Sequence, residues 1–256
     1  MTIFILIFSA LLIATAAYFR LYLYLSPKNR LTILMYHQIK PESNDPLTVT
    51  LENVEKQFRT IREKGYDSLF FNDLENGQYR KPLIITFDDG YANNAEYLPE
   101  LLEKYNLKAT IFIPTALVQN GYEEYQLMCF NQVQNLDPNL FEIGLHSHKH
   151  INYRHITPAE AEEDIRQNIE ILDRHGIPHS KVFAFPFGKM PKDAGDKRAL
   201  HAIFEKLDIR YAVRIGNKIN RYPTDQKYEL CRVDIRGNDS LFRFKMKLIF
   251  GKLKIM

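Results

Sequence analysis

A pair of adjacent carboxylates lies where a metal ion and a proton acceptor could meet. Asp88 and Asp89 follow the apolar run Leu83 to Phe87 and precede Gly90. Neighbouring carboxylates cannot both point the same way, so one can bind a metal ion while the other faces the reacting atoms. Asp-Gly is also ordinary turn chemistry, and for this segment alone a turn is the better explanation.

Three histidines in one short segment form a second polar cluster. His146, His148 and His150 lie in the sequence HSHKH, which again follows an apolar run. Imidazole is a common metal ligand, and a turn would bring His146 and His150 to one ion while His148 points away. An exposed polar loop that binds metal only adventitiously is the alternative.

Together the two clusters are more specific than either alone. One carboxylate and two imidazoles make a three-ligand metal site with open positions for water and substrate. The neighbouring carboxylate can deprotonate that water. These are the groups that metal-assisted amide hydrolysis needs.

Strands alternating with helices must position these residues. Apolar runs of strand length lie at 31–36, 83–87, 110–113, 141–145, 182–185 and 211–215. The clearest helix between them begins at Thr157, which forms a capping box with Glu160 and is followed by Pro158. The alternation predicts a (β/α) barrel, distorted or incompletely closed, with a flat doubly wound sheet as the alternative. Either fold places catalytic groups at the carboxyl ends of strands, where both clusters lie.

The two clusters and two further segments resemble a known family. TFDDG (residues 86–90) and HSHKH (146–150, read as His-Ser-x-x-His) look like the first two motifs of the polysaccharide deacetylases, the NodB-homology domain or carbohydrate esterase family four. FAFPFG (183–188) is similar to the third motif. The opening Met35-Tyr36-His37 resembles the start of the subgroup that acts on extracellular and envelope polysaccharides. The resemblance runs from about residue 31 to residue 240.

The resemblance implies a role for each matching residue. Asp89, His146 and His150 would bind a divalent metal, with zinc expected, and Asp88 would be the general base. A backbone N–H near Tyr91 would help to stabilise the oxyanion. The products would be acetate and a free amine.

Two departures from the family pattern concern the groups around the base. Many members have an arginine two positions before the proline of the third motif, where it orients the base, but Ala184 occupies that position. Many also have a late histidine that protonates the leaving amine, but no histidine follows His201. His37 is the candidate replacement acid, with a plain substrate contact or a packed histidine equally open.

Other residues are expected around the substrate. The resemblance makes Phe185, Pro186 and Phe187 one wall of the groove. Arg232 and Asp234, at the end of a late strand, would contact substrate or support the base, and a surface ion pair is the alternative.

Composition is that of a globular protein. The 256 residues are 45% hydrophobic and 25% charged, and the net charge of +3 is too small to indicate nucleic acid as a partner. Neither of the two cysteines has a second ligand at zinc-site spacing. Nothing in the sequence indicates a nucleotide cofactor.

The chain begins with an uncharged apolar segment. Residues 3–19 contain no charge, and residues 1–25 are predicted to be a single-pass transmembrane anchor. A cleaved signal peptide is the alternative because Ala14-Thr15-Ala16 resembles a processing site, although no Lys or Arg precedes the apolar run. The positive residues after the span favour a cytoplasmic domain but leave the side of the membrane open.

The last residues, 241–256, form a basic tail after the expected catalytic domain (26–240). Its five basic residues flank an apolar face that contains Phe242, Met246, Ile249 and Phe250. This pattern predicts an amphipathic helix at a membrane interface, and a helix packed on the domain is the alternative.

These observations predict a metal-dependent hydrolase that removes the N-acetyl group from an amino sugar of a polysaccharide or lipid-linked glycan. The expected partners are the glycan and the membrane, without nucleic acid. Two other functions stay open: a catalytically weak glycan-binding protein that keeps the metal site, and an O-deacetylase.

Overall fold

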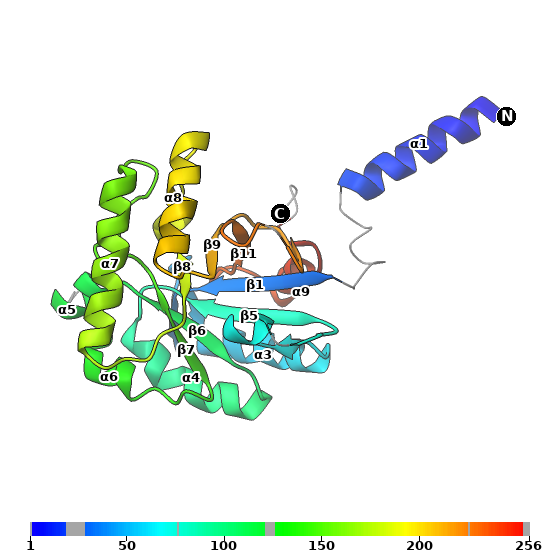
Figure 1. The fold of residues 1–256 in the computed structure, drawn as a ribbon. Helices are drawn as coiled ribbons and strands as arrows, with labels where there is room; N and C mark the ends of the chain where they lie inside the picture. Colours follow the sequence, from blue (N-terminus) through cyan, green and yellow to red (C-terminus); the bar gives the residue numbers. More distant parts are fainter. Residues whose placement is uncertain (1, 19–28, 76, 121–125, 225, 253–256) are drawn as a thin grey trace.

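The computed structural model describes residues 2–18, 29–75, 77–120, 126–224 and 226–252, and Figure 1 shows strands enclosed by helices. Seven parallel strands pair in sequence around a ring. They are β1 (Arg30–Tyr36), β5 (Pro82–Phe87), β6 (Ala109–Ile113), β7 (Phe141–Leu145), β8 (Val182–Ala184), β9 (Tyr211–Ile215) and β11 (Leu230–Asp234).

The ring closes through β1. This strand pairs in parallel with β5, where Leu34 lies opposite Ile85, and also with β11, where Leu34 lies opposite Val233. The expected (β/α) barrel is therefore present, and the flat doubly wound sheet is not. Between β7 and β8 the pairing is short and joins Leu145 to Phe183.

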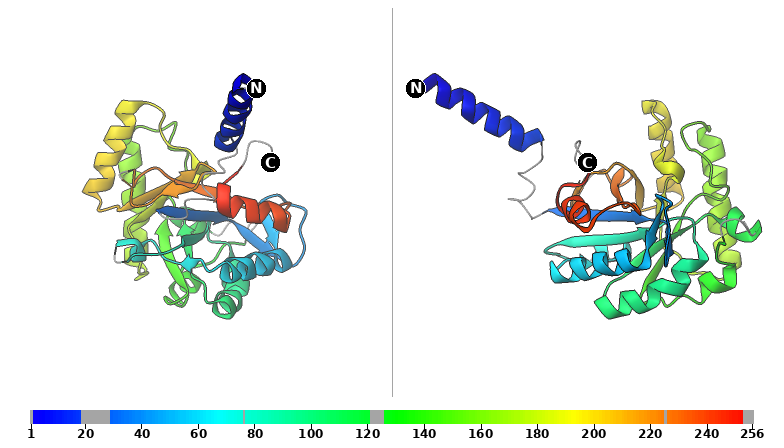
Figure 2. Two further views of the ribbon diagram at one scale, coloured as in Figure 1. Left: turned by 90° about the vertical axis from the view of Figure 1, so that its right-hand side faces the viewer. Right: turned by 180° about the vertical axis from the view of Figure 1, so that it is seen from behind.

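Helices cover the outside of the ring in neighbouring pairs, α3 beside α4 and α7 beside α8 (Figure 2). The helices on the barrel are α3 (Leu51–Glu63), α4 (Ala92–Tyr105), α5 (Thr115–Asn120), α6 (Phe130–Gln134), α7 (Pro158–Arg174), α8 (Ala194–Lys206) and α9 (Leu241–Phe250). Short elements are β2 (Gln38–Lys40), β3 (Thr48–Thr50), β4 (Asp67–Ser68), β10 (Asn220–Arg221), and the 3₁₀ turns η1 (Asn72–Glu75) and η2 (Pro186–Gly188).

The predicted capping box begins α7. The Thr157 hydroxyl accepts a hydrogen bond from the Glu160 backbone N–H, and the Glu160 carboxylate accepts one from the Thr157 N–H. These bonds satisfy backbone donors that the first helical turn leaves unpaired.

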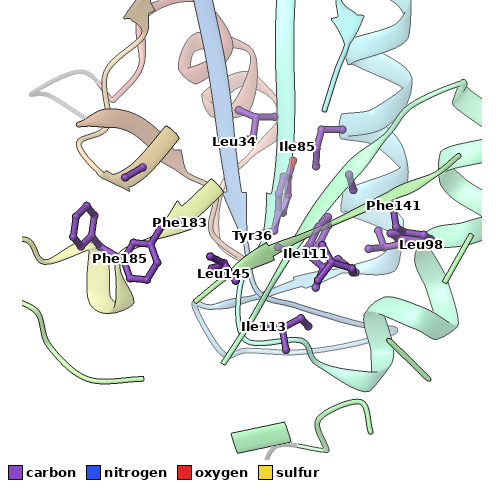
Figure 3. Packing of buried hydrophobic residues seen from close by; sticks show 14 of the residues in the cluster. Leu34, Tyr36, Ile85, Leu98, Ile111, Ile113, Phe141, Leu145, Phe183 and Phe185 are labelled. Carbon is purple, nitrogen blue, oxygen red and sulfur yellow. The ribbon is translucent and has the colours of Figure 1, made fainter. Parts of the chain in front are cut away.

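Alternation along the strands divides the core into two layers. One side of each strand faces the barrel interior, where Ile33, Ile84, Phe112 and Val213 pack together. The other side packs against the helices in a larger cluster, shown in Figure 3, that includes Leu98 of α4. The apolar interior forms a floor beneath the carboxyl ends of the strands.

The predicted transmembrane anchor is wrong. The N-terminal helix α1 (Thr2–Tyr18) has 17 residues, and none of the helices in the described ranges is long and apolar enough to cross a membrane. Localisation as a single-pass membrane-anchored protein is corrected for the same reason. The rest of the predicted anchor, residues 19–25, lies outside the described residues.

Helix α9, in the basic tail, packs on the barrel. Its buried face contains Phe244, Lys247 and Leu248, whereas Phe242 on the predicted apolar face is 69% exposed. Lys247 can be buried because Nζ donates to the Asp234 carbonyl at 2.7 Å and pairs with the Asp239 carboxylate. The packed-helix alternative therefore describes α9. Residues 253–256 lie outside the described ranges, and the division of the chain at residues 25 and 240 stays a prediction.

Candidate active site

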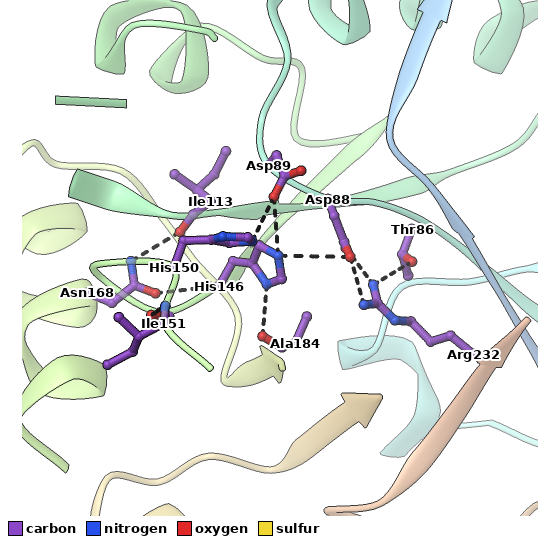
Figure 4. A network of polar contacts seen from close by, with 11 residues as sticks. Thr86, Asp88, Asp89, Ile113, His146, His150, Ile151, Asn168, Ala184 and Arg232 are labelled. Carbon is purple, nitrogen blue, oxygen red and sulfur yellow. Dashed lines mark hydrogen bonds and ion pairs between the residues drawn. The ribbon is translucent and has the colours of Figure 1, made fainter. Parts of the chain in front are cut away.

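Both predicted polar clusters lie at the carboxyl ends of barrel strands that flank β6. Asp88 and Asp89 directly follow β5, and His146 directly follows β7. Figure 4 shows the side chains of these residues converging with His150 at one end of the barrel. Parallel strands present all their carboxyl ends at the same end of the barrel, which explains the meeting.

Left-handed backbone makes the two turns. Asp89 has φ 71°, and Ser147 and His150 have φ 70° and 54°. L-residues other than glycine seldom adopt this region, although Asp, Asn and His do so more often than most. At Asp89 it separates the two carboxylates, so that Asp88 points toward Arg232 and Asp89 toward His146 and His150 (Figure 4).

Three candidate ligand atoms converge beside Asp89. Asp89 Oδ1 lies 3.4 Å from His146 Nε2 and 3.2 Å from His150 Nε2, and all three atoms lie within 4.8 Å of one another. Asp89 Oδ1 is buried and makes no hydrogen bond of good geometry. A buried carboxylate oxygen needs a partner, and a cation shared with the two imidazoles would supply it. The residues therefore fit a divalent metal ion.

The tautomer of His146 also fits a metal ligand. Its Nδ1 lies 2.8 Å from the Ala184 carbonyl oxygen. A carbonyl only accepts, so Nδ1 carries the proton and Nε2 keeps its lone pair toward Asp89. The Ala184 side chain cannot replace the family's arginine, but its backbone orients a ligand.

The ligand carboxylate is strongly acidic. Burial alone would raise the pKa of Asp89, but the adjacent imidazoles of His146 and His150 outweigh it and hold the pKa well below its ordinary value. Asp89 is therefore ionised at neutral pH, as a metal ligand must be.

Asp88 is held by a buried arginine. Arg232 is 0% exposed, and its Nη1 and Nη2 donate to Asp88 Oδ1 and Oδ2 at 2.5 and 2.7 Å. Burial would raise the pKa of Asp88, but the charge of Arg232 and its hydrogen bonds to the carboxylate oppose this, and the pKa lies below its ordinary value. The candidate base is therefore ionised and fixed in orientation.

Arg232 is fixed by contacts of its own. Its Nη1 also donates to Thr86 Oγ1 at 3.2 Å, and its guanidinium carbon lies 5.5 Å from the centroid of the Phe112 ring. Of the alternatives open for this residue, the structure places it against Asp88 and not in a surface ion pair. Asp234 pairs with Arg236, whose Nε donates to Asp234 Oδ2 at 2.6 Å.

A cavity of about 440 Å³ opens beside the candidate ligands. Phe187 and Tyr91 line it, as expected for groove residues, and the Phe187 ring lies 4.7 Å from the His150 ring. Phe185 and Pro186 do not line it. Both are buried, and the Phe185 ring packs against Phe183.

The two remaining histidines of interest, His37 and His148, lie in different surroundings. His37 directly follows β1 and is partly buried, and His37 makes a small contribution to lowering the pKa values of Asp88 and Asp89. His148 points away from the candidate ligands, with Nδ1 3.0 Å from Thr115 Oγ1. That placement agrees with the expectation for His148.

Two polar residues of α7 that the sequence analysis missed support the histidine turn. Asn168 Oδ1 accepts from the His146 N–H at 3.0 Å. Asp164 accepts from the backbone N–H groups of His148 and Lys149 at 3.1 and 2.9 Å. Both are buried, so polar residues four positions apart on the buried face of an amphipathic helix were the available signal.

Comparison with known families gives a match over residues 75–211, to the family described as polysaccharide deacetylase. The matched segment contains β5 to β8 and the turns that carry Asp88, Asp89, His146 and His150. The chain belongs to the polysaccharide deacetylase family. Arg232 and His37 lie outside the matched segment, so this deacetylase family member holds its candidate base with a residue beyond the match.

One curated relative within the polysaccharide deacetylase family is a distant match. The putative polysaccharide deacetylase YxkH of Bacillus subtilis (strain 168) is 26% identical over 166 residues. The alignment covers 62% of this chain and 57% of YxkH, so the chain matches little more than half the length of that relative.

Solved structures share the fold. The Streptococcus pyogenes deacetylase PplD superposes with a TM-score of 0.75 at 21% identity, over 87% of this chain and 99% of PplD. IcaB from Ammonifex degensii superposes with a TM-score of 0.72 at 18% identity, over 86% of this chain and 96% of IcaB. The putative polysaccharide deacetylase BA0330 from Bacillus anthracis superposes with a TM-score of 0.71 at 22% identity, over 86% of this chain and 69% of BA0330.

Proposed function

We propose that this protein is a metal-dependent hydrolase that removes the N-acetyl group from an amino sugar of a glycan. The observation that carries the proposal is the convergence of Asp89, His146 and His150 directly beside a buried, ionised Asp88. Family membership agrees with a deacetylase. The sugar, the metal and the preference for N-acetyl over O-acetyl groups are parts of the proposal.

Zn²⁺ is the cation we propose. Two imidazoles and one carboxylate are a ligand set found in catalytic zinc sites, which keep a position for water or substrate. When bound, the ion supplies a Lewis acid that polarises the acetyl carbonyl and acidifies the attacking water. Asp89, His146 and His150 would hold it.

Asp88 is proposed as the general base. Its Oδ2 lies 3.9 Å from His146 Nε2, so the carboxylate borders the space where the ligand atoms meet. Both of its oxygens accept from Arg232, which leaves their remaining lone pairs for the proton of an attacking water. Arg232 thus acts as a positioning residue for the base.

Three further residues have proposed roles in binding the substrate and completing the reaction. Tyr91 lines the cavity at the N-terminal cap of α4, where backbone N–H groups favour negative charge, and we assign its N–H to the developing oxyanion. His37 is the candidate donor of a proton to the leaving amine. Phe187 would contact the face of the sugar ring.

Acetate release tests the function. Metal-loaded enzyme is incubated with N-acetylglucosamine oligomers and with an O-acetylated glycan, and acetate and free amine are measured separately. We expect equal amounts of acetate and amine from the N-acetylated substrate, and loss of both in Asp88→Asn. Release only from the ester would identify an O-deacetylase. No release from either, with metal bound, would favour a glycan-binding protein.

A further inference from the structure

A second cavity lies on the outer wall of the barrel, beside β9 and β11. Its volume is about 560 Å³, which exceeds that of the cavity beside the candidate metal ligands. Its lining includes three basic residues, Arg214, Lys218 and Arg221, together with Glu229 and Cys231. None of Asp88, Asp89, His146 and His150 lines it.

The strand pattern explains why these residues face outward. Val213 packs in the barrel interior, so its neighbour Arg214 lies on the opposite face of β9. After β9 the chain turns back, and β10 pairs antiparallel with β1, which brings Arg221 opposite Arg30. The returning segment and the outer face of the sheet enclose the cavity between them. In Figure 1 this region lies between α8 and α9.

The described residues that line the cavity carry unbalanced charges. Arg214, Lys218 and Arg221 form no ion pair with any of the described residues. Glu229 is the only acid among the described lining residues, and its carboxylate already lies 3.4 Å from Lys197 Nζ. The described lining is therefore positive and lacks an anionic partner.

Arg214 has an unmet hydrogen-bonding need. Its Nε is buried and has no partner in the described structure, and its Nη1 reaches the Ile215 carbonyl only at 3.4 Å. Buried donors of charged groups are seldom left unpaired in folded proteins. A ligand with several acceptor oxygens would satisfy this donor and the nearby cations together.

We propose that this cavity is an anion site that binds a phosphate group, either free phosphate or a phosphate monoester on a sugar. Arginine recognises phosphate through paired N–H donors, and lysine adds a point charge. The volume lies within the range of small-ligand sites and leaves space for a sugar beside the phosphate. The site is separate from the candidate metal centre and does not depend on the proposed function.

Cys231 supplies a reporter inside the cavity. The chain has two cysteines, and Cys129 is exposed, so Cys129→Ser leaves Cys231 as the single thiol. In metal-loaded protein at constant ionic strength, the rate of Cys231 modification by a small methanethiosulfonate reagent is measured with increasing inorganic phosphate. Calorimetric titration with inorganic phosphate and with N-acetylglucosamine 1-phosphate measures binding independently of the thiol.

Charge-matched variants assign the binding to this cavity. Lys218→Gln with Arg221→Gln removes two exposed lining cations, and Arg62→Gln with Lys245→Gln removes the same charge from exposed positions that do not line the cavity. We expect phosphate to slow Cys231 modification in the control pair but not in the lining pair. The lining pair should also bind phosphate at least tenfold more weakly, with an unchanged melting temperature.

Two results would overturn the proposal. One is equal phosphate affinity in the lining and control pairs, which would place any bound phosphate elsewhere, including at the metal. The other is no binding of either phosphate compound to the parent protein. Tighter binding of the sugar phosphate than of inorganic phosphate would assign the site to a glycan-borne phosphate, and equal binding would assign it to free phosphate.

Discussion

Arg232 holds Asp88 through two parallel hydrogen bonds, although the residues are 144 positions apart in the chain. The strands that carry them, β5 and β11, are the two parallel neighbours of β1 in the ring. Closure of the barrel therefore brings the guanidinium to the candidate base. Asp88, His146 and Arg232 form one continuous polar row across the end of the barrel (Figure 4).

Replacing Arg232 by lysine should slow catalysis without emptying the metal site. Lysine keeps the charge but cannot donate two parallel hydrogen bonds to the carboxylate. We expect kcat to fall about 10- to 100-fold, the range found for partners that orient the residues of a site. Steady-state kinetics and metal content measure the two effects. An unchanged kcat would show that orientation by Arg232 is not needed.

Asp88→Asn should lose activity and stability together. Losing a general base costs about 10²- to 10⁴-fold in rate. The same change leaves the fully buried Arg232 without its counter-charge, and breaking a buried ion pair from one side costs about 3–5 kcal/mol. Acetate release and urea unfolding measure the two losses.

The double variant Asp88→Leu with Arg232→Met should be more stable than Asp88→Leu alone. The opposite order would contradict the buried-pair account.

His148 and His150 offer a matched test of the ligand assignment. His150 Nε2 faces Asp89, whereas His148 Nδ1 contacts Thr115. His150→Ala should lower Zn²⁺ affinity by at least about tenfold, as expected when one of three ligands is lost. His148→Ala should keep the stoichiometry of the parent. Metal analysis after dialysis at fixed free Zn²⁺ measures both. Equal metal loss in the two variants would remove His150 from the ligand set.

Gly144 is predicted to be required because the Phe112 ring beneath the site leaves no room for a larger side chain. A Cβ at this position would lie 2.5 Å from Cε1 of Phe112, whose ring lies next to both Arg232 and His146. Overpacking of this kind costs about 1–3 kcal/mol, so Gly144→Ala should lower the free energy of unfolding by that amount. Adding Phe112→Leu should recover part of the loss. Failure of the second change to restore any stability would rule out this clash as the cause.

Glu142 lies near the start of β7, at the end of the barrel away from the candidate site, and should make the stability of the fold depend on pH. Burial raises the pKa of Glu142 above its ordinary value of 4.5, and the hydrogen bonds from Phe71, Thr110 and Asn72 only partly oppose this. Protonated Glu142 therefore contributes to the stability of the fold. This contribution is complete below the ordinary pKa and is lost as pH rises through the raised pKa.

The isosteric variant Glu142→Gln isolates this effect. We expect the parent to lose stability relative to Glu142→Gln as pH rises above the ordinary pKa of 4.5, because only the parent must bury a charge. Urea unfolding of both proteins across that range measures the difference. A difference that stays flat with pH would contradict the raised pKa.

The local parts of this site could be read from the sequence, and the long-range parts could not. Asp88, Asp89, His146 and His150 follow apolar strands directly, so strand periodicity places them at one end of the sheet. The contact between Arg232 and Asp88 depends on which strands close the ring, and no local pattern carries that information. The sequence therefore leaves two roles for Arg232, a role beside the base and a surface ion pair.

Side-chain direction also limited the sequence analysis. Phe185 and Phe187 are equivalent by composition, but Phe185 ends in the core while Phe187, at φ 56°, turns outward beside His150. On α9, a helical projection treats every lysine as polar. It therefore could not anticipate that Asp239 allows Lys247 to be buried.

Restoring metal to stripped enzyme tests the central claim most directly. The enzyme is treated with a chelator, dialysed, and titrated with Zn²⁺ while acetate release from an N-acetylglucosamine oligomer is measured. We predict that activity returns in proportion to added Zn²⁺ and saturates at one ion per chain, and that His150→Ala needs a higher concentration. Full activity in the stripped enzyme, or no return of activity after one ion has bound, would contradict a metal-dependent deacetylase centred on Asp89, His146 and His150.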